Sequence, residues 1–126
     1  MPAQLFDTVD AMISPEGLHG LLGHAVEAVD RRPLDVEHFS GNTLEQVRAW
    51  HAGHVSHFVL KHFHPEDDWI MRLTHDHAVR EVALFRSGIY ARLPPQCYVP
   101  IIAVARNGRS WSSLMVDVAR LLEPPL

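Results

Sequence analysis

The dipeptide Asn107-Gly108 constrains the fold of this chain more than any other feature. It separates two runs of strand-like residues, CYVPIIAVAR and RSWSSLMVDV, which occupy residues 97–106 and 109–118. Asn-Gly between two such runs is the strongest short-range signal for a β-hairpin, because both residues tolerate the backbone angles of a tight turn. We therefore expect two antiparallel strands in the C-terminal third of the chain.

Three further segments have the pattern of strands. Residues 24–34 alternate in polarity, and Pro33 restricts that strand to an edge or an end of a sheet. After the turn signal Gly41-Asn42, residues 44–50 can run back as a second strand, and the chain reverses again around Gly53. The segment FVLKHF, residues 58–63, is rich in apolar and aromatic residues. Its period of two places Val59, Lys61 and Phe63 on one face of the strand.

Helices are predicted in two main places. Ser14-Pro15-Glu16 is a typical helix start, and Gly23 is well placed to end that short helix. Residues 75–88 have apolar side chains at helical spacing, and Pro65 with the acids that follow it opens a helical turn. Residues 1–12 suggest a loose helix or a tail. The predicted fold class is α+β, with an antiparallel sheet of about five strands, one main packed helix and a short N-terminal helix.

Size and composition exclude several classes of protein. A chain of 126 residues with 47% apolar residues is one folded domain in size. It has no apolar run of about 20 residues and no secretory signal at its start, so we expect a cytoplasmic protein without membrane contact. The formal charge of −4 argues against nucleic acid as a partner. The single cysteine, Cys97, cannot form an internal disulfide.

Lys61 is the only lysine in a chain that has ten arginines. Arginine is a wide planar fork and lysine is a compact point charge, so a narrow site would retain lysine. Glu81 lies beside the apolar stripe of the predicted helix 75–88, at its border with solvent or with a cleft. From that border Glu81 can reach a charge on a packed neighbour, and Lys61 is the obvious candidate. An ordinary surface ion pair is the alternative interpretation.

The octamer THDHAVRE, residues 74–81, also permits a metal site. On a helix His75 and His77 would lie nearly opposite one another, about 200° apart. On a strand they would share a face, and with Glu81 they would resemble the first motif of cupin metal sites. The glycine expected before the first histidine and any later PxGxxH-type motif are absent from the sequence. A cupin-like metal-binding protein with His75, His77 and Glu81 as ligands remains an alternative.

The order of these segments resembles the N-terminal lobe of protein-kinase-like phosphotransferases, specifically the aminoglycoside phosphotransferase group of small-molecule kinases. FVLK is similar to the third strand, which bears the phosphate-binding lysine, and HAVREVALFR to the following helix with its glutamate. YVPIIAVARNGRSWSSLMVDV resembles strands four and five, which run into the hinge that holds adenine. HFSGNTLEQV falls at the place of the nucleotide-covering loop. The resemblance covers most of residues 24–122, after an N-terminal helical segment at 1–23.

The resemblance implies ATP as the ligand, with Mg²⁺ as its counterion. Lys61 would contact the α- and β-phosphates, and Glu81 would hold Lys61 in place. The remaining residues implied to bind the nucleotide are Gly41 in the covering loop, Val59 over the adenine face, Met115 at the back of the pocket, and the backbone from Val116 to Val118.

Two departures from the family pattern limit what the chain is expected to do. Only Gly41 stands where kinases often have several glycines. No HRD-like or DFG-like segment is present, and the aspartates that orient the small-molecule acceptor and bind Mg²⁺ belong to a second lobe in this family. Residues 123–126 resemble the start of a linker to that lobe, so we expect no catalysis by this chain alone. An exposed apolar face that binds a partner or a second copy is expected. The third alternative is a non-catalytic interaction domain, in which Lys61 and Glu81 are structural.

Overall fold

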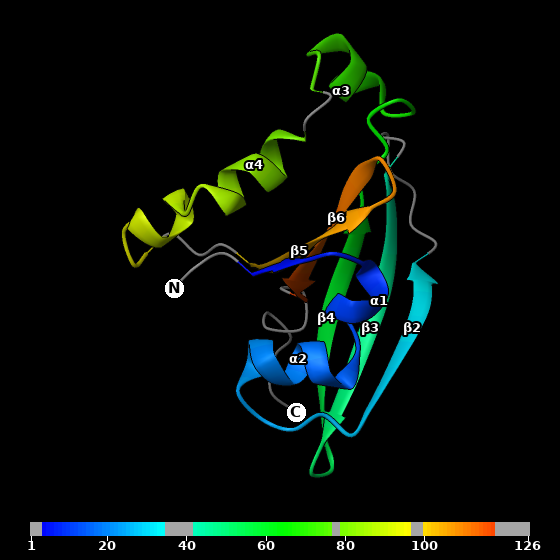
Figure 1. The fold of residues 1–126 in the computed structure, drawn as a ribbon, viewed down its shortest axis with the longest axis vertical. Helices are drawn as coiled ribbons and strands as arrows, with labels where there is room; N and C mark the ends of the chain where they lie inside the picture. The colour runs from blue at the N-terminus through cyan, green and yellow to red at the C-terminus, as the bar shows by residue number, and fades with distance from the viewer. Residues whose placement is uncertain (1–3, 35–41, 77–78, 97–99, 118–126) are drawn as a thin grey trace.

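The structure is a computed structural model that describes residues 4–34, 42–76, 79–96 and 100–117. It is an α+β fold built on one six-stranded mixed sheet that does not close into a barrel (Figure 1). The elements in chain order are β1 (Leu5–Phe6), α1 (Val9–Met12), α2 (Pro15–Leu22), β2 (Ala28–Leu34), β3 (Thr43–His51), β4 (His54–His62), α3 (Trp69–Leu73), α4 (Arg80–Arg86), the 3-10 helix η1 (Ile89–Arg92), β5 (Ile101–Asn107) and β6 (Ser110–Val116). None of the described helices is long and apolar enough to cross a bilayer.

The strand order in the sheet is β1-β5-β6-β4-β3-β2. The strands from β2 to β6 pair antiparallel with their neighbours in the sheet. The sixth strand was not predicted: Leu5 and Phe6 form β1, which pairs parallel to β5. The expectation of an antiparallel sheet of about five strands was therefore wrong in that β1 adds a sixth strand in parallel pairing. The loose helix or tail expected over residues 1–12 is found in part, as the short helix α1 after β1. A two-residue strand is too short to produce a periodic pattern.

The hairpins predicted around Gly53 and at Asn107-Gly108 are both present. The β3–β4 turn is Ala52-Gly53, and both residues have positive φ, 48° and 79°, as a type I′ turn requires. The β5–β6 loop is Gly108-Arg109, one residue later than the sequence suggested, because Asn107 pairs with Ser110. Gly108 has φ 60° at the first loop position, where a type II′ turn needs glycine.

The short helix α2 has the predicted ends, whereas the predicted helix 75–88 is shorter than expected. The Ser14 hydroxyl accepts a hydrogen bond from the Gly17 N–H at 3.0 Å, and Gly23 ends α2 with φ 79°. In contrast, His75 and Val79 both have φ 55°, which is incompatible with helical backbone, so α4 begins only at Arg80. Residues 77–78 lie outside the described residues.

Each face of the sheet has its own apolar cluster. On one face, which we call the α1/α2 face, the N-terminal helices pack on β3, β4, β5 and β6 through buried residues that include Met12, Leu18 and Leu60. On the other, the α4 face, Val82 packs with Phe63, the residue after β4, and with Val104 of β5. This alternation follows the predicted period of two in FVLKHF, and it places Lys61 on the α4 face.

Candidate functional site

Lys61 and Glu81 meet on the α4 face of the sheet. Lys61 is the penultimate residue of β4 and Glu81 lies in the first turn of α4. The Lys61 Nζ donates to Glu81 Oε2 at 3.4 Å, and the two side chains are 27% and 35% exposed. The contact expected from the sequence is therefore found, and its role in binding a ligand stays a prediction.

The surroundings of Lys61 fix the direction of its side chain. Its ammonium lies 4.8 Å from the centroid of the Phe63 ring, two residues further along the same face. Its direct neighbours on the adjoining strands are Leu44 on β3 and Ser113 on β6. Ser113 is fully buried, and its hydroxyl has no hydrogen-bond partner among the described residues.

A cavity of about 230 Å³ opens at the Lys61–Glu81 contact. Besides these two residues and apolar neighbours, Asn42, Asp68 and Asp76 line it. Asn42 is buried, and its Oδ1 accepts a hydrogen bond from the His64 N–H at 2.9 Å. This bond ties the start of β3 to the segment that follows β4.

The predicted adenine contacts are brought together in part. Val59 on β4 is paired with Met115 on β6, on the face that carries Lys61 and two residues along β4 from it. The backbone N–H of Val116 donates to the Pro100 carbonyl at 3.0 Å, and that of Asp117 donates to the His57 carbonyl at 3.1 Å. Neither N–H group is therefore free to donate a hydrogen bond to an adenine base. Gly41 and Val118 lie outside the described residues.

The metal hypothesis gains no support from the described residues. His75 belongs to the turn after α3 and Glu81 to α4, while His77 lies outside the described part of the chain. No group of three or more His, Cys, Asp or Glu residues converges within residues 4–34, 42–76, 79–96 and 100–117. The single open sheet also differs from the double-sheet jelly roll of cupins.

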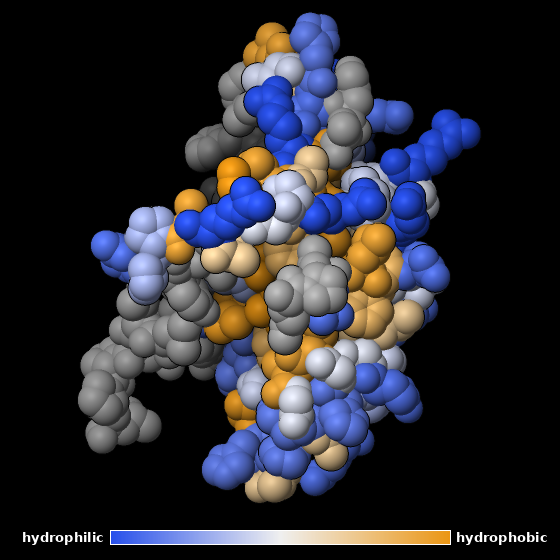
Figure 2. Space-filling view, turned by 60° about the vertical axis from the view of Figure 1, so that its left-hand side comes forward, coloured by the Kyte–Doolittle hydropathy of each residue, from blue (hydrophilic) through white to orange (hydrophobic). Residues whose placement is uncertain are grey.

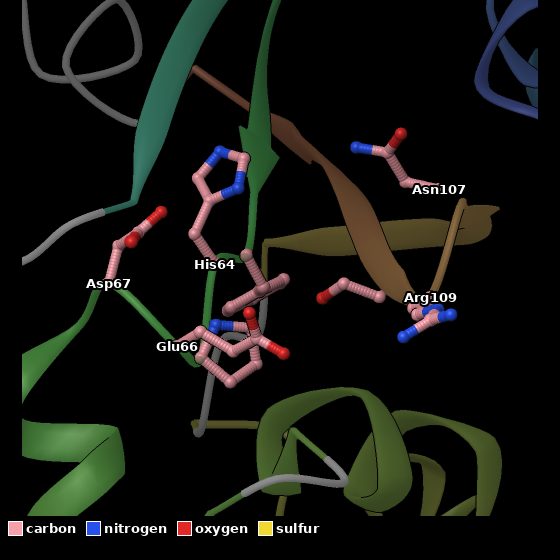
Figure 3. Close-up of a pocket in the computed structure, with 8 residues that line it drawn as sticks. His64, Glu66, Asp67, Asn107 and Arg109 are labelled. Atoms are coloured by element: carbon pink, nitrogen blue, oxygen red, sulfur yellow. The ribbon is translucent and has the colours of Figure 1, made fainter.

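A second cavity, of about 290 Å³, lies beyond Phe63 at the end of β4. In Figure 3, His64 and Glu66 lie on one side of it and Arg109 on the other. The Ser110 hydroxyl beside it is buried without a hydrogen-bond partner among the described residues. The lining carries charges of both signs and therefore selects no single class of ligand.

A polar network on the α1/α2 face was missed by the sequence analysis. The His62 Nε2 contacts the Glu45 carboxylate, which also accepts two hydrogen bonds from Arg31, at 3.1 and 2.8 Å. Burial acts to raise the pKa of Glu45, but the hydrogen bonds from Arg31 and His62 outweigh it, so the pKa is lowered. The only signal for this network in the sequence was the period of two in β4, which places His62 on the opposite face of the sheet from Lys61.

Four of the six large apolar side chains that are exposed among the described residues lie in or next to the helices after β4. Leu73, Leu84, Ile89 and Leu93 are 70%, 44%, 44% and 39% exposed. Figure 2 shows hydrophobic residues in the middle of one side of the molecule, above a mostly hydrophilic lower end. The expectation of an apolar face that binds a partner or a second copy stays a prediction.

Comparison of the chain with protein-family models, with curated proteins and with solved structures gives no match.

Proposed function

We propose that this chain is the ATP-binding lobe of a small-molecule phosphotransferase. The observation that carries the proposal is the contact between the only lysine of the chain, at the end of β4, and a glutamate in the first turn of α4. In kinase-type phosphotransferases a strand lysine binds the nucleotide phosphates, and a helix glutamate holds that lysine in place.

The dimensions of the site support phosphate binding at Lys61. The cavity of about 230 Å³ is smaller than the roughly 300–1,000 Å³ typical of pockets for drug-sized ligands, so it accommodates only part of a nucleotide. The adjoining apolar pair Val59 and Met115 is suited to the flat face of adenine. Phosphates at Lys61 and adenine at this pair would lie along one face of β4.

The charges around Lys61 favour a nucleotide bound with Mg²⁺. Asp68, Asp76 and Glu81 line the same cavity, and they oppose a bare polyphosphate. Asp76 accepts a hydrogen bond from the Arg80 N–H at the start of α4, and Asp68 accepts one from the Met71 N–H in α3, so both have structural roles. The Mg²⁺ ligands and the residues that orient the small-molecule acceptor are expected in a second lobe.

The proposal can be tested by labelling with an acyl-phosphate derivative of ATP, which transfers its acyl group to a lysine near the bound phosphates. Lys61 is the only lysine, so the N-terminal amine provides the internal background. We expect a single acylated lysine by mass spectrometry, with labelling suppressed by excess Mg·ATP. Lys61→Arg keeps the charge and removes the nucleophile, so it should leave only the background.

Acylation of Lys61 that excess Mg·ATP does not suppress would overturn the proposal. Absence of labelling, combined with the absence of a heat of binding for Mg·ATP in calorimetry, would also overturn it. The non-catalytic interaction domain would then be favoured, since it requires no nucleotide and is consistent with the exposed leucines around α4.

A further inference from the structure

The His62 side chain, on β4, contacts side chains of both neighbouring strands, β3 and β6. Its side chain is 13% exposed, and both ring nitrogens have partners. The Nε2 contacts Glu45 on β3, and the Nδ1 lies 2.6 Å from the hydroxyl of Ser112 on β6. Ser112 is fully buried and also accepts a hydrogen bond from the Asn107 side-chain amide at 3.1 Å.

The two strands that His62 joins are the strands that contact Lys61. Leu44 and Ser113 are the direct neighbours of Lys61, and each adjoins in sequence one partner of His62. Glu45 follows Leu44, and Ser112 precedes Ser113. Because side chains alternate between faces, this bridge crosses β3, β4 and β6 on the α1/α2 face, directly behind the backbone that carries Lys61 on the α4 face.

We infer that His62 is a positioning residue for Lys61: the imidazole bridge from Glu45 through His62 to Ser112 sets the place of the Lys61 ammonium beside Glu81. Arg31 extends the bridge to β2 and, through Asp10 at 3.2 Å, to α1. His62 therefore acts on the candidate site through the sheet, without touching a ligand. The effect on the lysine stands independently of nucleotide binding, and the effect on affinity rests on the proposed function.

The hydrogen bonds define which side chain can replace His62. The Glu45 carboxylate only accepts, so the Nε2 of His62 carries a proton and donates to it. The Nδ1 then accepts from the Ser112 hydroxyl when the ring is neutral. A glutamine offers the same pair of groups, an N–H donor and a carbonyl acceptor, on a side chain of similar reach. An alanine offers neither group.

The inference can be tested on Lys61 directly, because the chain has a single lysine. Reductive ¹³C-methylation keeps the charge and yields one dimethyl-lysine signal by NMR, apart from the N-terminal amine. We expect His62→Ala to move this signal to the position of a solvent-exposed lysine, and His62→Gln to restore most of the native shift. The matched control is Asp30→Asn, which breaks the Asp30–Arg48 pair on the β2–β3 ladder and should leave the signal in place.

The same variants give a second readout in the nucleotide assay. We expect His62→Ala to weaken Mg·ATP binding about 3- to 10-fold, with His62→Gln and Asp30→Asn close to the parent protein. If His62→Ala does not fold, Ser112→Ala removes only the far end of the bridge and should move the lysine signal in the same direction.

An unmoved lysine signal in a folded His62→Ala or Ser112→Ala variant would overturn the inference even where the parent protein binds nucleotide. A moved signal in a protein that binds no nucleotide would support the positioning role and overturn the proposed function instead.

Discussion

Lys61 and Glu81 are 20 residues apart in the sequence, and their charged groups lie 3.4 Å apart across the α4 face of the sheet. Both side chains are about one-third exposed or less. An ion pair with this access to solvent contributes only about 0–1 kcal/mol to stability. Stability alone therefore gives little reason for the only lysine of the chain to lie at this position, whereas a phosphate ligand would.

Glu81→Gln should separate ligand binding from stability. The substitution keeps the shape of the side chain and removes the charge that holds Lys61. We expect the free energy of unfolding to change by less than about 1 kcal/mol in urea titrations. Acylation of Lys61 by the ATP probe should fall about 10-fold, because the ammonium loses its fixed position.

Glu66→Gln, in the neighbouring cavity, is the control, and its Lys61 should be labelled as in the parent protein. Equal labelling of both variants would count against a role for Glu81.

Elements whose signal is local were predicted from the sequence. The helix α2 was predicted because Ser14 and Gly23 supply its two caps, and the β3–β4 hairpin was predicted from the strand-like runs around Gly53. The Lys61–Glu81 contact was also anticipated, because strand periodicity and helical periodicity each placed one partner.

Features that depend on distant parts of the chain were not predicted. The strand β1 forms only because Leu5 and Phe6 pair with the edge of β5, which is distant in the sequence. The late start of α4 follows from the left-handed backbone at Val79, although the residues around it have helical spacing. The partners of His62, namely Glu45 and Ser112, come from strands that adjoin β4 only after the sheet has formed. No local pattern encodes such partners.

The network around Glu45 should make stability depend on acid. Its pKa is lowered below the ordinary value of 4.5 in the folded state. Glu45 therefore contributes stability above pH 4.5, and that contribution is lost as the pH falls through the lower, folded-state pKa. Glu45→Gln should lower the free energy of unfolding at pH 7 by about 1.5 kcal/mol, because it removes charge-assisted hydrogen bonds.

The same substitution should also flatten the pH profile. Urea unfolding of Glu45→Gln and of the parent protein should converge as the pH is lowered below 4.5. Some acid sensitivity should remain, because hydrogen bonds from Arg48 also lower the pKa of Asp30. A constant difference between the two proteins from pH 7 to pH 3 would contradict this role of Glu45.

The N-terminal helices should unfold together with the sheet. Met12 is fully buried in the cluster that contains Phe58 and Leu60 from β4. Met12→Ala should lower the free energy of unfolding by about 2–5 kcal/mol, because it leaves a cavity in that cluster. Thermal unfolding followed by circular dichroism should remain a single transition. The exposed Leu84 provides the control, and Leu84→Ala should change the stability by less than about 0.5 kcal/mol. Two separate transitions would show that residues 4–22 fold independently of the sheet.

Two glycines of α2 should respond in opposite directions to alanine. A Cβ at Gly17 would lie 2.2 Å from the Ala11 carbonyl oxygen and 2.7 Å from that of Met12, and backbone atoms cannot move aside cheaply. Gly17→Ala should therefore destabilise the protein by about 1–3 kcal/mol. A Cβ at Gly20 meets nothing within 4 Å, so Gly20→Ala should stabilise it by about 0.5–1 kcal/mol through helix propensity. Both values can be measured by urea unfolding at pH 7. Equal effects of the two substitutions would mean that the close approach of α1 to α2 at Gly17 is not required, because α1 would then have room to shift at little cost.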